Sequence, residues 1–294
     1  MNSRLSKLLI TGGHGQLASV LRYGSLNKKY TLIHCSKNAM DITNEESIHR
    51  AINYYQPNII INTAAYTAVD KAENEHQLAM QINHIGAKNL AISCEHYRIP
   101  LIHFSTDYVF DGTQTFAYSE NDSTNPINVY GMSKWLGEEA IRKHCQQYII
   151  LRISGLFSEY GNNFLKTILR LAKEKNELRI VTDQITCPTH ANNIANVLFN
   201  LIKTLRYWGT YHYCDAQAIS WYEFAVTIIE KAKKYHLLSI EKILAITSAQ
   251  YPTVAKRPAY SVLNCNKIHH DYGIVQLQWY PCITRTIDRL FSQL

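Results

Sequence analysis

Residues 7–18 read Lys-Leu-Leu-Ile-Thr-Gly-Gly-His-Gly-Gln-Leu-Ala, and this stretch decides the fold. A short apolar run is followed at once by Gly12, Gly13 and Gly15, three of only 12 glycines in 294 residues. Glycine allows a tight turn and a close approach of the backbone to a pyrophosphate at the N-terminus of the next helix. A purely structural turn could use the same residues, but the position between a strand and a helix favours dinucleotide binding.

Similar apolar runs recur through the first 215 residues, at 30–34, 58–62, 100–104, 148–152 and 210–214. Their continuous β-branched character is typical of parallel strands that are covered on both faces. Helical patterns lie between them over 75–97, over 127–146 and over 43–56, where Thr43 to Glu46 fits a capping box. This alternation predicts an α/β fold, a Rossmann-like doubly wound parallel sheet.

The pattern loosens after residue 215, where we expect a helix over 220–236, a strand over 242–246 and a C-terminal helix. We interpret this part as belonging to a smaller α/β cap that binds the substrate. The predicted dinucleotide-binding domain comprises residues 1–154 plus 187–215, and the predicted substrate-binding domain comprises residues 155–186 plus 216–294.

Charge is divided unevenly between the two halves of the chain. Residues 1–150 hold 13 basic and 13 acidic residues, whereas residues 151–294 hold 17 and 10, which accounts for the whole net charge of +7. The excess favours an anionic partner in the second half. A nucleic acid is the weakest candidate because no basic aromatic stripe or known binding module occurs, so a small phosphorylated molecule fits better.

The remaining composition points to a cytoplasmic protein without a membrane partner or a metal. No run of 18 apolar residues occurs, and residues 1–7 are too few for a signal peptide before the first strand. The seven cysteines are scattered without a Cys-x-x-Cys pair, and the histidines lack metal-ligand spacing. This usage is typical of reduced thiols in the cytoplasm.

The residues after the second apolar run bear on the choice of cofactor. An NAD-selective site usually has an acid here for the ribose 2′-hydroxyl, but this chain reads Cys35-Ser36-Lys37. Ser36 and Lys37 could accept a 2′-phosphate, which favours NADPH with NADH as the alternative. Lys37 would also suit a solvated loop.

Tyr130 and Lys134 stand four residues apart at the start of a predicted helix, so both project from one face. An ammonium beside the phenol would lower the Tyr130 pKa towards neutrality and produce a general acid for a carbonyl oxygen. Thr106 ends the preceding strand, where a doubly wound sheet places its ligands. A Tyr-x-x-x-Lys pair alone is common, but with Thr106 and the glycine loop it predicts a carbonyl reductase.

With these residues the chain resembles the extended short-chain dehydrogenases/reductases and, within them, the dTDP-4-dehydrorhamnose reductase family. The matching segments cover roughly residues 8–264 and are Gly12 to Leu17, Asn62 to Glu73, Ser105 to Gly112, Tyr130 to Lys134, Gly161 to Phe164, Asp183-Gln184, Pro188-Thr189 and Arg257-Pro258 with Ser261. The segments Tyr-Thr-x-Val-Asp-Lys-Ala-Glu and Ser-Thr-Asp-Tyr-Val-Phe are far more specific than the glycine loop.

The resemblance implies that NAD(P)H delivers hydride to C4 of a nucleotide-linked 4-keto-6-deoxy sugar. Tyr130 would donate the proton, Lys134 would hold the nicotinamide ribose, and Thr106 would orient the keto group. The cofactor would contact Gly12, Gly15, Gln16, Leu17, Ser36, Lys37, Asp41, Ile42, Ala64, Ala65, Tyr66, Tyr130 and Lys134. The sugar nucleotide would contact Thr67, Val69, Thr106, Asp107, Tyr108 and Asn163. We add Arg257 for the diphosphate because an arginine fork suits phosphate oxygens, although a surface role is an equal alternative.

Two departures from the family pattern matter. Gly155 stands where the family typically has a Trp against the sugar, so a related dTDP-4-keto-6-deoxyhexose that yields a sugar other than rhamnose stays open. Some members share a magnesium ion held by glutamates between two subunits. Val20 stands at one such position and residues 289–294 hold no acid, so we predict no magnesium and leave open a monomer or a weak homodimer.

Two rival functions are compatible with a chain that has a glycine loop and a Tyr-x-x-x-Lys pair. A sugar-nucleotide 4,6-dehydratase or epimerase is the nearest, but dehydratases usually carry Glu where Tyr108 stands. A non-catalytic NADP-binding regulatory subunit is the rival from another class. Such a subunit would have no need to keep Thr106, Tyr130 and Lys134 together.

Overall fold

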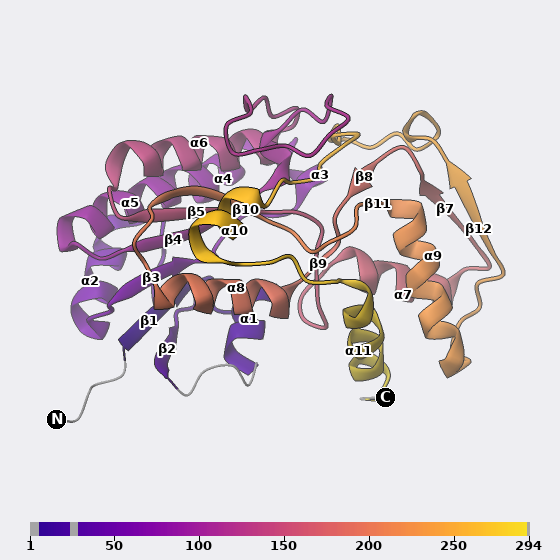
Figure 1. The fold of residues 1–294 in the computed structure, drawn as a ribbon, viewed down its shortest axis with the longest axis horizontal. Coiled ribbons are helices and arrows are strands. Elements are labelled where there is room, and N and C mark those ends of the chain that lie inside the picture. The colour runs from indigo at the N-terminus through magenta and orange to yellow at the C-terminus, as the bar shows by residue number, and fades with distance from the viewer. Residues whose placement is uncertain (1–5, 24–28, 293–294) are drawn as a thin grey trace.

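The structure is a computed structural model that describes residues 6–23 and 29–292 (Figure 1). The prediction about a signal peptide rests largely on residues 1–5, which lie outside this range. No helix of the described residues is long and apolar enough to cross a membrane. The seven cysteines are all buried and carry free thiols.

Within the described residues, six parallel strands form the central sheet in the order β10-β5-β4-β3-β1-β2. Their bounds are β1 (Ser6–Thr11), β2 (Tyr30–His34), β3 (Ile59–Asn62), β4 (Leu101–Thr106), β5 (Tyr148–Ile153) and β10 (Gly209–Tyr213). The strands coincide with the predicted apolar runs, so the predicted fold class is confirmed. Because β2 and β3 pair on opposite sides of β1, the carboxyl ends of β1 and β3 border the crevice where such sheets bind ligands.

Helices cover both faces of the sheet, which explains why the strands are apolar throughout. One apolar cluster joins the sheet to α1 (Gln16–Tyr23) and α8 (Ala191–Lys203). A second cluster joins the other face to α2 (Glu45–Tyr55), α5 (Gly86–Tyr97) and α6 (Val129–His144). The short elements on the β3–α5 connection are α3 (Val69–Ala72), α4 (His76–Met80) and a π-helical turn, η1 (Gln81–Ile85).

The predicted capping box before α2 is wrong by one residue. Asn44, and not Thr43, caps the helix, because its side-chain oxygen accepts from the Ser47 backbone N–H at 2.9 Å. The Thr43 hydroxyl instead donates to Asp41 at 2.8 Å.

The cap forms the right-hand part of Figure 1 and has an apolar cluster of its own, built mainly on α7 (Phe164–Glu174), α9 (Trp221–Ala232) and α11 (Tyr280–Phe291). The short strands and turns outside the central sheet that follow β5 are β6 (Leu156–Phe157), β7 (Glu177–Val181), β8 (Ile185–Thr186), β9 (Thr189–His190), β11 (Ile219–Ser220), η3 (Lys233–Tyr235), β12 (Lys242–Ile246) and η4 (Ser248–Gln250). Helix α10 (Asn266–Tyr272) packs on β10 of the central sheet. The predicted domain boundaries stay a proposal.

Candidate active site

The glycine loop joins β1 to α1 and closes against the ends of two other strands. Gly12 has a φ of +63°, and a Cβ at this position would lie 2.7 Å from the Cα of Ala64, just after β3. The Gly13 N–H donates to the Cys35 carbonyl at 2.8 Å, just after β2. Side chains larger than hydrogen would push the loop off the sheet. The loop therefore brings the N-terminus of α1 to the crevice.

A cavity of about 480 Å³, which we call the loop cavity, lies beside this loop at the ends of β4 and β5. It brings together many of the predicted site residues, from both the cofactor and the substrate groups: Gly15, Gln16, Leu17, Ala65, Thr67, Thr106, Asp107, Tyr130 and Lys134. Residues that are far apart in the chain thus meet in one place.

Gln16 offers an unused donor to this cavity. Its side-chain Nε2 is buried and has no hydrogen-bond partner among the described residues. Its Oε1 lies 3.4 Å from Asn163 Nδ2 of the cap. Asn163 in turn caps α7 by accepting from the Lys166 N–H at 3.2 Å. A buried donor without a partner is costly, so a ligand with acceptor oxygens would satisfy it.

Several predicted cofactor residues lie outside the loop cavity. Ser36 accepts from the Ala39 N–H at 3.4 Å, and Lys37, whose side chain is 73% exposed, lies 3.8 Å from Asp41. Ile42 is buried against Gly86, and Ala64 lies under Gly12.

On the β3 side, the Tyr66 hydroxyl donates to Glu75 at 2.7 Å. Val69 begins α3.

Thr106 and Tyr130 are positioned by the end of β4 and the start of α6. The Thr106 hydroxyl donates to Asp107 at 3.0 Å and accepts from the Tyr108 N–H at 3.2 Å. Tyr130 lies in the first turn of α6, which Asn128 caps by accepting from the Gly131 N–H at 2.7 Å. Both side chains face the loop cavity.

Lys134 is buried one turn further along α6, with 2% of the residue exposed. Its Nζ donates to the Phe104 carbonyl at 2.7 Å and lies 3.2 Å from His103 Nε2. It makes no hydrogen bond to Tyr130 in the described structure.

The prediction that Lys134 lowers the Tyr130 pKa is wrong. Burial raises the pKa of Tyr130 to about 12, and the nearby Thr106 hydroxyl offsets this only in part. Burial also lowers the pKa of Lys134 to about 8. The expected Tyr–Lys interaction is missing because Lys134 is buried and its Nζ is turned towards β4, so desolvation decides the direction of both pKa shifts.

A second cavity of about 600 Å³, the cap cavity, lies between the central sheet and the cap. Tyr108 and Arg257 line it. Arg257 forms a two-pronged ion pair with Asp70, at 2.6 Å and 3.1 Å. Sequence reasoning missed Asp70, although it lies inside the Asn62 to Glu73 segment, because a partner 187 residues away cannot be inferred from spacing.

Part of the wall of the cap cavity is aromatic. Phe164 and Trp221 line it with ring centroids 4.5 Å apart. Gly155, where the family resemblance leads us to expect a Trp, lines the loop cavity and not the cap cavity. It has a φ of +55°, and a Cβ there would lie 2.6 Å from the Cys187 carbonyl oxygen. The backbone here thus excludes a large side chain, and aromatic surface comes from the cap.

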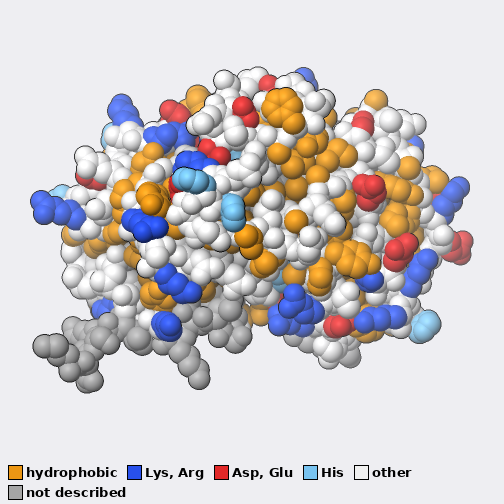
Figure 2. All heavy atoms as spheres, in the orientation of Figure 1, with side chains coloured by type: hydrophobic (Ala, Val, Ile, Leu, Met, Phe, Trp, Pro, Cys, Tyr) orange, Lys and Arg blue, Asp and Glu red, His pale blue; other side chains and the backbone are white. Residues whose placement is uncertain are grey.

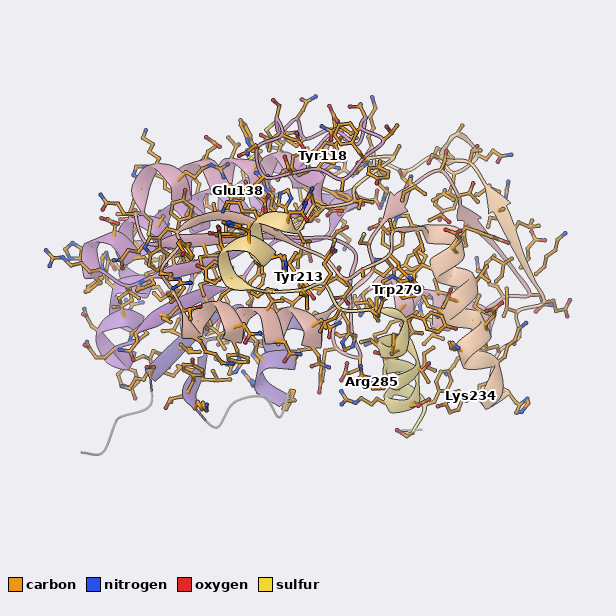
Figure 3. All side chains as sticks on the ribbon, viewed as in Figure 1. Tyr118, Glu138, Tyr213, Lys234, Trp279 and Arg285 are labelled. Atoms are coloured by element: carbon orange, nitrogen blue, oxygen red, sulfur yellow. The ribbon has the colours of Figure 1, made fainter. Side chains whose placement is uncertain are left out.

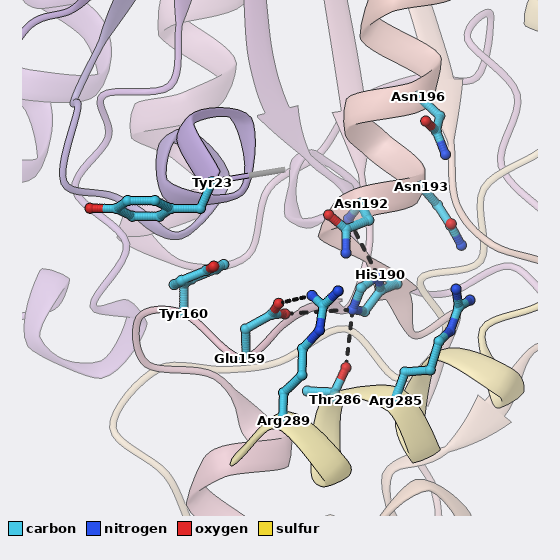
Figure 4. Close-up of a pocket in the computed structure, with 10 residues that line it drawn as sticks. All are labelled: Tyr23, Glu159, Tyr160, His190, Asn192, Asn193, Asn196, Arg285, Thr286 and Arg289. Atoms are coloured by element: carbon cyan, nitrogen blue, oxygen red, sulfur yellow. Dashed lines mark hydrogen bonds and ion pairs between the residues drawn. The ribbon is translucent and has the colours of Figure 1, made fainter. Parts of the chain in front are cut away.

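A third cavity of about 460 Å³ shares no lining residue with either and contains none of the predicted site residues (Figure 4). Arg289 pairs with Glu159, and His190 Nε2 lies 3.1 Å from the Thr286 hydroxyl. Across the parts of the chain that the structure describes, no group of three or more His, Cys, Asp or Glu side chains is placed to hold a metal ion.

Comparison with known proteins gives consistent matches over nearly the full chain. Residues 6–292 match the family model described as RmlD substrate binding domain. A dTDP-4-dehydrorhamnose reductase from Aggregatibacter actinomycetemcomitans is 41% identical over 283 residues, which cover 94% of this chain and 96% of the relative.

Two solved structures are similar to this chain over nearly its full length. A dTDP-4-dehydrorhamnose reductase from Clostridium acetobutylicum has a TM-score of 0.91 and 35% identity, with 97% of this chain and 99% of that chain covered. One from Bacillus anthracis, solved in complex with NADP, has a TM-score of 0.89 and 36% identity, with coverage of 99% and 100%.

Proposed function

Because this chain belongs to the RmlD substrate binding domain family, we propose that it is a reductase of the dTDP-4-dehydrorhamnose type. It reduces the C4 keto group of a nucleotide-linked 4-keto-6-deoxy sugar with NADPH. The observation that carries this proposal is the meeting of Thr106, Tyr130 and Lys134 in one cavity beside the glycine loop. Two relatives that cover 94% and 88% of this chain are named dTDP-4-dehydrorhamnose reductase.

The residues of the loop cavity fit a dinucleotide. The glycine loop leaves room for a pyrophosphate at the N-terminus of α1, and the unpartnered Gln16 Nε2–H supplies a donor for it. Ser36 and Lys37, which follow β2, are candidates for binding the 2′-phosphate of the cofactor. Lys134 is the candidate for binding the nicotinamide ribose. When bound, NADPH supplies the hydride for the sugar carbon.

Tyr130 is the proton donor in this proposal. With a pKa of about 12 its hydroxyl is protonated at neutral pH, which is the form that a reduction needs. The carbonyl oxygen takes the Tyr130 proton as negative charge develops on it, and the Thr106 hydroxyl, beside Tyr130, holds the oxygen in line.

The cap cavity is the candidate site for the nucleotide end of the substrate. Arg257 can contact the diphosphate, and the Phe164–Trp221 wall offers an apolar face to a base or a sugar. Thr67, Val69, Asp107, Tyr108 and Asn163 complete the proposed substrate group. The absence of a side chain at Gly155 favours a second candidate substrate, a related dTDP-4-keto-6-deoxyhexose that yields a sugar other than rhamnose.

The distribution of surface charge bears on the kind of partner that this chain binds. Figure 2 shows Lys and Arg side chains scattered among acidic and apolar ones on this face, and not gathered into one stripe. That pattern supports a small anionic substrate over a nucleic acid. We propose a cytoplasmic enzyme of sugar-nucleotide biosynthesis for cell-surface polysaccharide, acting as a monomer or a weak homodimer.

The deciding experiment incubates the purified chain with NADPH and each available dTDP-4-keto-6-deoxyhexose. We expect stoichiometric loss of the absorbance of reduced nicotinamide and a 4-hydroxy product whose stereochemistry NMR identifies. A chain that binds NADPH but consumes none with any of these sugars would fit a regulatory subunit instead. Turnover without net use of NADPH would fit a dehydratase.

A further inference from the structure

A line of buried hydroxyl and carboxyl groups leads from the loop cavity to the cap, and we call it the hydroxyl network. The Thr106 hydroxyl lies 3.0 Å from Asp107 Oδ1, and Asp107 Oδ2 lies 2.8 Å from the Ser154 hydroxyl. The Ser154 hydroxyl in turn lies 3.0 Å from the Thr186 hydroxyl on β8. All four residues are at most 6% exposed. Only Thr106 and Asp107 line the loop cavity, so the network extends behind its wall.

These contacts do not depend on where the protons lie. Each hydroxyl can both donate and accept, and a carboxyl group can accept whether or not it is ionised. Either oxygen of the Ser154–Thr186 pair can be the donor. Ser154 also lies 3.3 Å from the Ser261 carbonyl oxygen, but the Thr186 hydroxyl has no other hydrogen-bond partner among the described residues. The one hydrogen bond of the Thr186 hydroxyl is therefore made to this network.

The bare backbone at Gly155 allows this contact to form. Ser154 and Gly155 follow β5, and Thr186 ends β8 directly before Cys187. A Cβ at Gly155 would lie 2.6 Å from the Cys187 carbonyl oxygen. A side chain at residue 155 would thus push residues 186–187 away and separate the Ser154 and Thr186 hydroxyls. Without one, β8 can lie against the end of β5.

Strand β8 is bonded to β11, which leads into the wall of the cap cavity. The two strands pair antiparallel with Thr186 opposite Ile219, and Trp221, which lines the cap cavity, follows β11 directly. Trp279 of the cap, labelled in Figure 3, donates from Nε1 to the Gln217 carbonyl at 2.9 Å just before β11. The strand pair that carries Thr186 is therefore anchored in the cap.

Strand β8 also holds the segment that follows Arg257. The Ile185 N–H donates to the Ala259 carbonyl at 2.8 Å, and the Ile185 carbonyl accepts from the Ser261 N–H at 2.9 Å. Arg257 lines the cap cavity two residues before Ala259. One short strand therefore contacts the hydroxyl network on one side and two segments that line the cap cavity on the other.

We propose that Thr186 is a positioning residue for the reduction. Its hydroxyl fixes Ser154 and, through Ser154, the Asp107 carboxyl group. Asp107 then fixes the direction of the Thr106 hydroxyl. The proposal rests on the proposed function, in which Thr106 orients the keto oxygen. Thr186 lines neither the loop cavity nor the cap cavity, so it acts only through the network. Because β8 is bonded to the walls of the cap cavity, the network aligns Thr106 with the site proposed for the nucleotide.

Thr186→Val tests the hydroxyl, because Val keeps the branched shape but cannot form the hydrogen bond. The assay uses the purified chain, NADPH and the dTDP-4-keto-6-deoxyhexose that it reduces. We expect kcat to fall roughly three- to tenfold, the effect of one hydrogen bond between neutral groups. The dissociation constant of NADPH should not change. Thr186→Ser keeps the hydroxyl and should restore most of the wild-type kcat. If Thr186→Val does not fold, the smaller Thr186→Ala replaces it.

Thr182→Val is the matched control for this series. The Thr182 hydroxyl donates to the Ile246 carbonyl at 3.2 Å, outside the hydroxyl network, so its loss should leave kcat unchanged. Equal kcat values for Thr186→Val and Thr182→Val would overturn the proposal. A Thr186→Ser variant as slow as Thr186→Val would also overturn it, because the shape of residue 186 and not its hydroxyl would then matter.

A spectroscopic measurement reads the same network without turnover. In a chain labelled with ¹³C at the threonine methyl groups, the Thr106 signal is assigned from Thr106→Ser. We expect Thr186→Val to move the Thr106 signal, Thr186→Ser to restore it and Thr182→Val to leave it in place. A Thr106 signal that stays in place in Thr186→Val would refute the proposal. A wild-type chain that reduces none of the sugars would refute the proposed function, and the NMR result would still decide whether Thr186 positions Thr106.

Discussion

At the scale of single residues, burial decides what each titratable group can do. Tyr130 was predicted to be a readily ionised phenol because Lys134 stands one turn away. Lys134 is buried and turned towards β4, and desolvation raises the pKa of the part-buried Tyr130 to about 12. A protonated phenol suits proton donation to a carbonyl oxygen, so the predicted residue keeps its predicted task for a different physical reason.

Replacement of Tyr130 tests this task. Tyr130→Phe removes the donated proton but keeps the ring, so kcat should fall roughly 10²- to 10⁴-fold. The dissociation constant of NADPH, followed by nicotinamide fluorescence, should change little because the glycine loop is untouched. An unchanged kcat would remove Tyr130 from the mechanism.

At the scale of elements, junctions between strands and helices are constrained by backbone contacts. Gly155 links β5 to β6 with a φ of +55°, and its Cα faces the Cys187 carbonyl. Asp215 follows β10 and holds the start of α8, because it accepts from the His190 N–H at 2.9 Å and from Asn193 at 2.8 Å. Both residues connect the sheet to neighbouring segments.

A glycine comparison separates backbone strain from crowding. Gly273 has a φ of +67°, and no atom lies within 4 Å of a Cβ added there. Gly273→Ala should therefore lower the free energy of unfolding by about 1 kcal/mol through backbone strain alone. Gly155→Ala adds a clash with the Cys187 carbonyl and should destabilise clearly more. Urea unfolding of both variants measures the difference, and equal losses would show that the carbonyl moves aside at no cost.

The pH dependence of stability tests Asp215. Burial raises its pKa to about 6, above the ordinary value of 3.8, so between these values the folded chain binds more protons than the unfolded chain. The contribution of Asp215 to the free energy of unfolding should therefore fall as pH rises from about 4 to about 6, by the order of 2 kcal/mol, and then level off.

Asp215→Asn provides the comparison for that curve. The amide can accept from His190 and Asn193 and donate to the Tyr213 hydroxyl, which lies 3.1 Å from the present carboxylate. The variant should gain stability relative to the wild type over this pH window, as measured by urea unfolding at each pH. A constant difference would contradict the raised pKa.

At the scale of the whole molecule, one ion pair connects the sheet side to the cap across the cap cavity. Asp70 on α3 holds both prongs of Arg257, and the Ala255 N–H also donates to Asp70 at 3.2 Å. Arg257 is therefore already oriented at the cavity where the diphosphate is proposed to lie. Arg257 is thus one basic residue of the positively charged second half that lies at the candidate site.

Substitution of Arg257 tests whether this side chain contacts the diphosphate of the substrate. Arg257→Gln should raise the KM for the sugar nucleotide roughly ten- to hundredfold, because charge-assisted hydrogen bonds contribute about 1.5–3 kcal/mol each. NADPH binding should be unchanged, since Arg257 does not line the loop cavity. Arg170→Gln, which removes an exposed arginine paired with Glu174, is the control. A KM equal to that of the control would show that Arg257 has only a structural role.

The sequence alone was sufficient for the fold class, the positions of the sheet strands and the group of Thr106, Tyr130 and Lys134. These depend on local signals, namely apolar runs, glycines at fixed offsets and side chains one helical turn apart. The N-cap of α2 was misplaced by one residue because Thr43 and Asn44 are neighbours that both favour this position, and the sequence does not distinguish them.

Only the tertiary structure decided how those residues are tuned. The pairing of Asp70 with Arg257, the aromatic wall of Phe164 and Trp221, and the contact of His103 with Lys134 join residues that are distant in the chain. Desolvation and hydrogen-bond direction depend on what encloses a group in space, so sequence spacing carries no information about them. The sequence by itself determined which groups are present, and the packing of strands and cap determined their protonation and their partners.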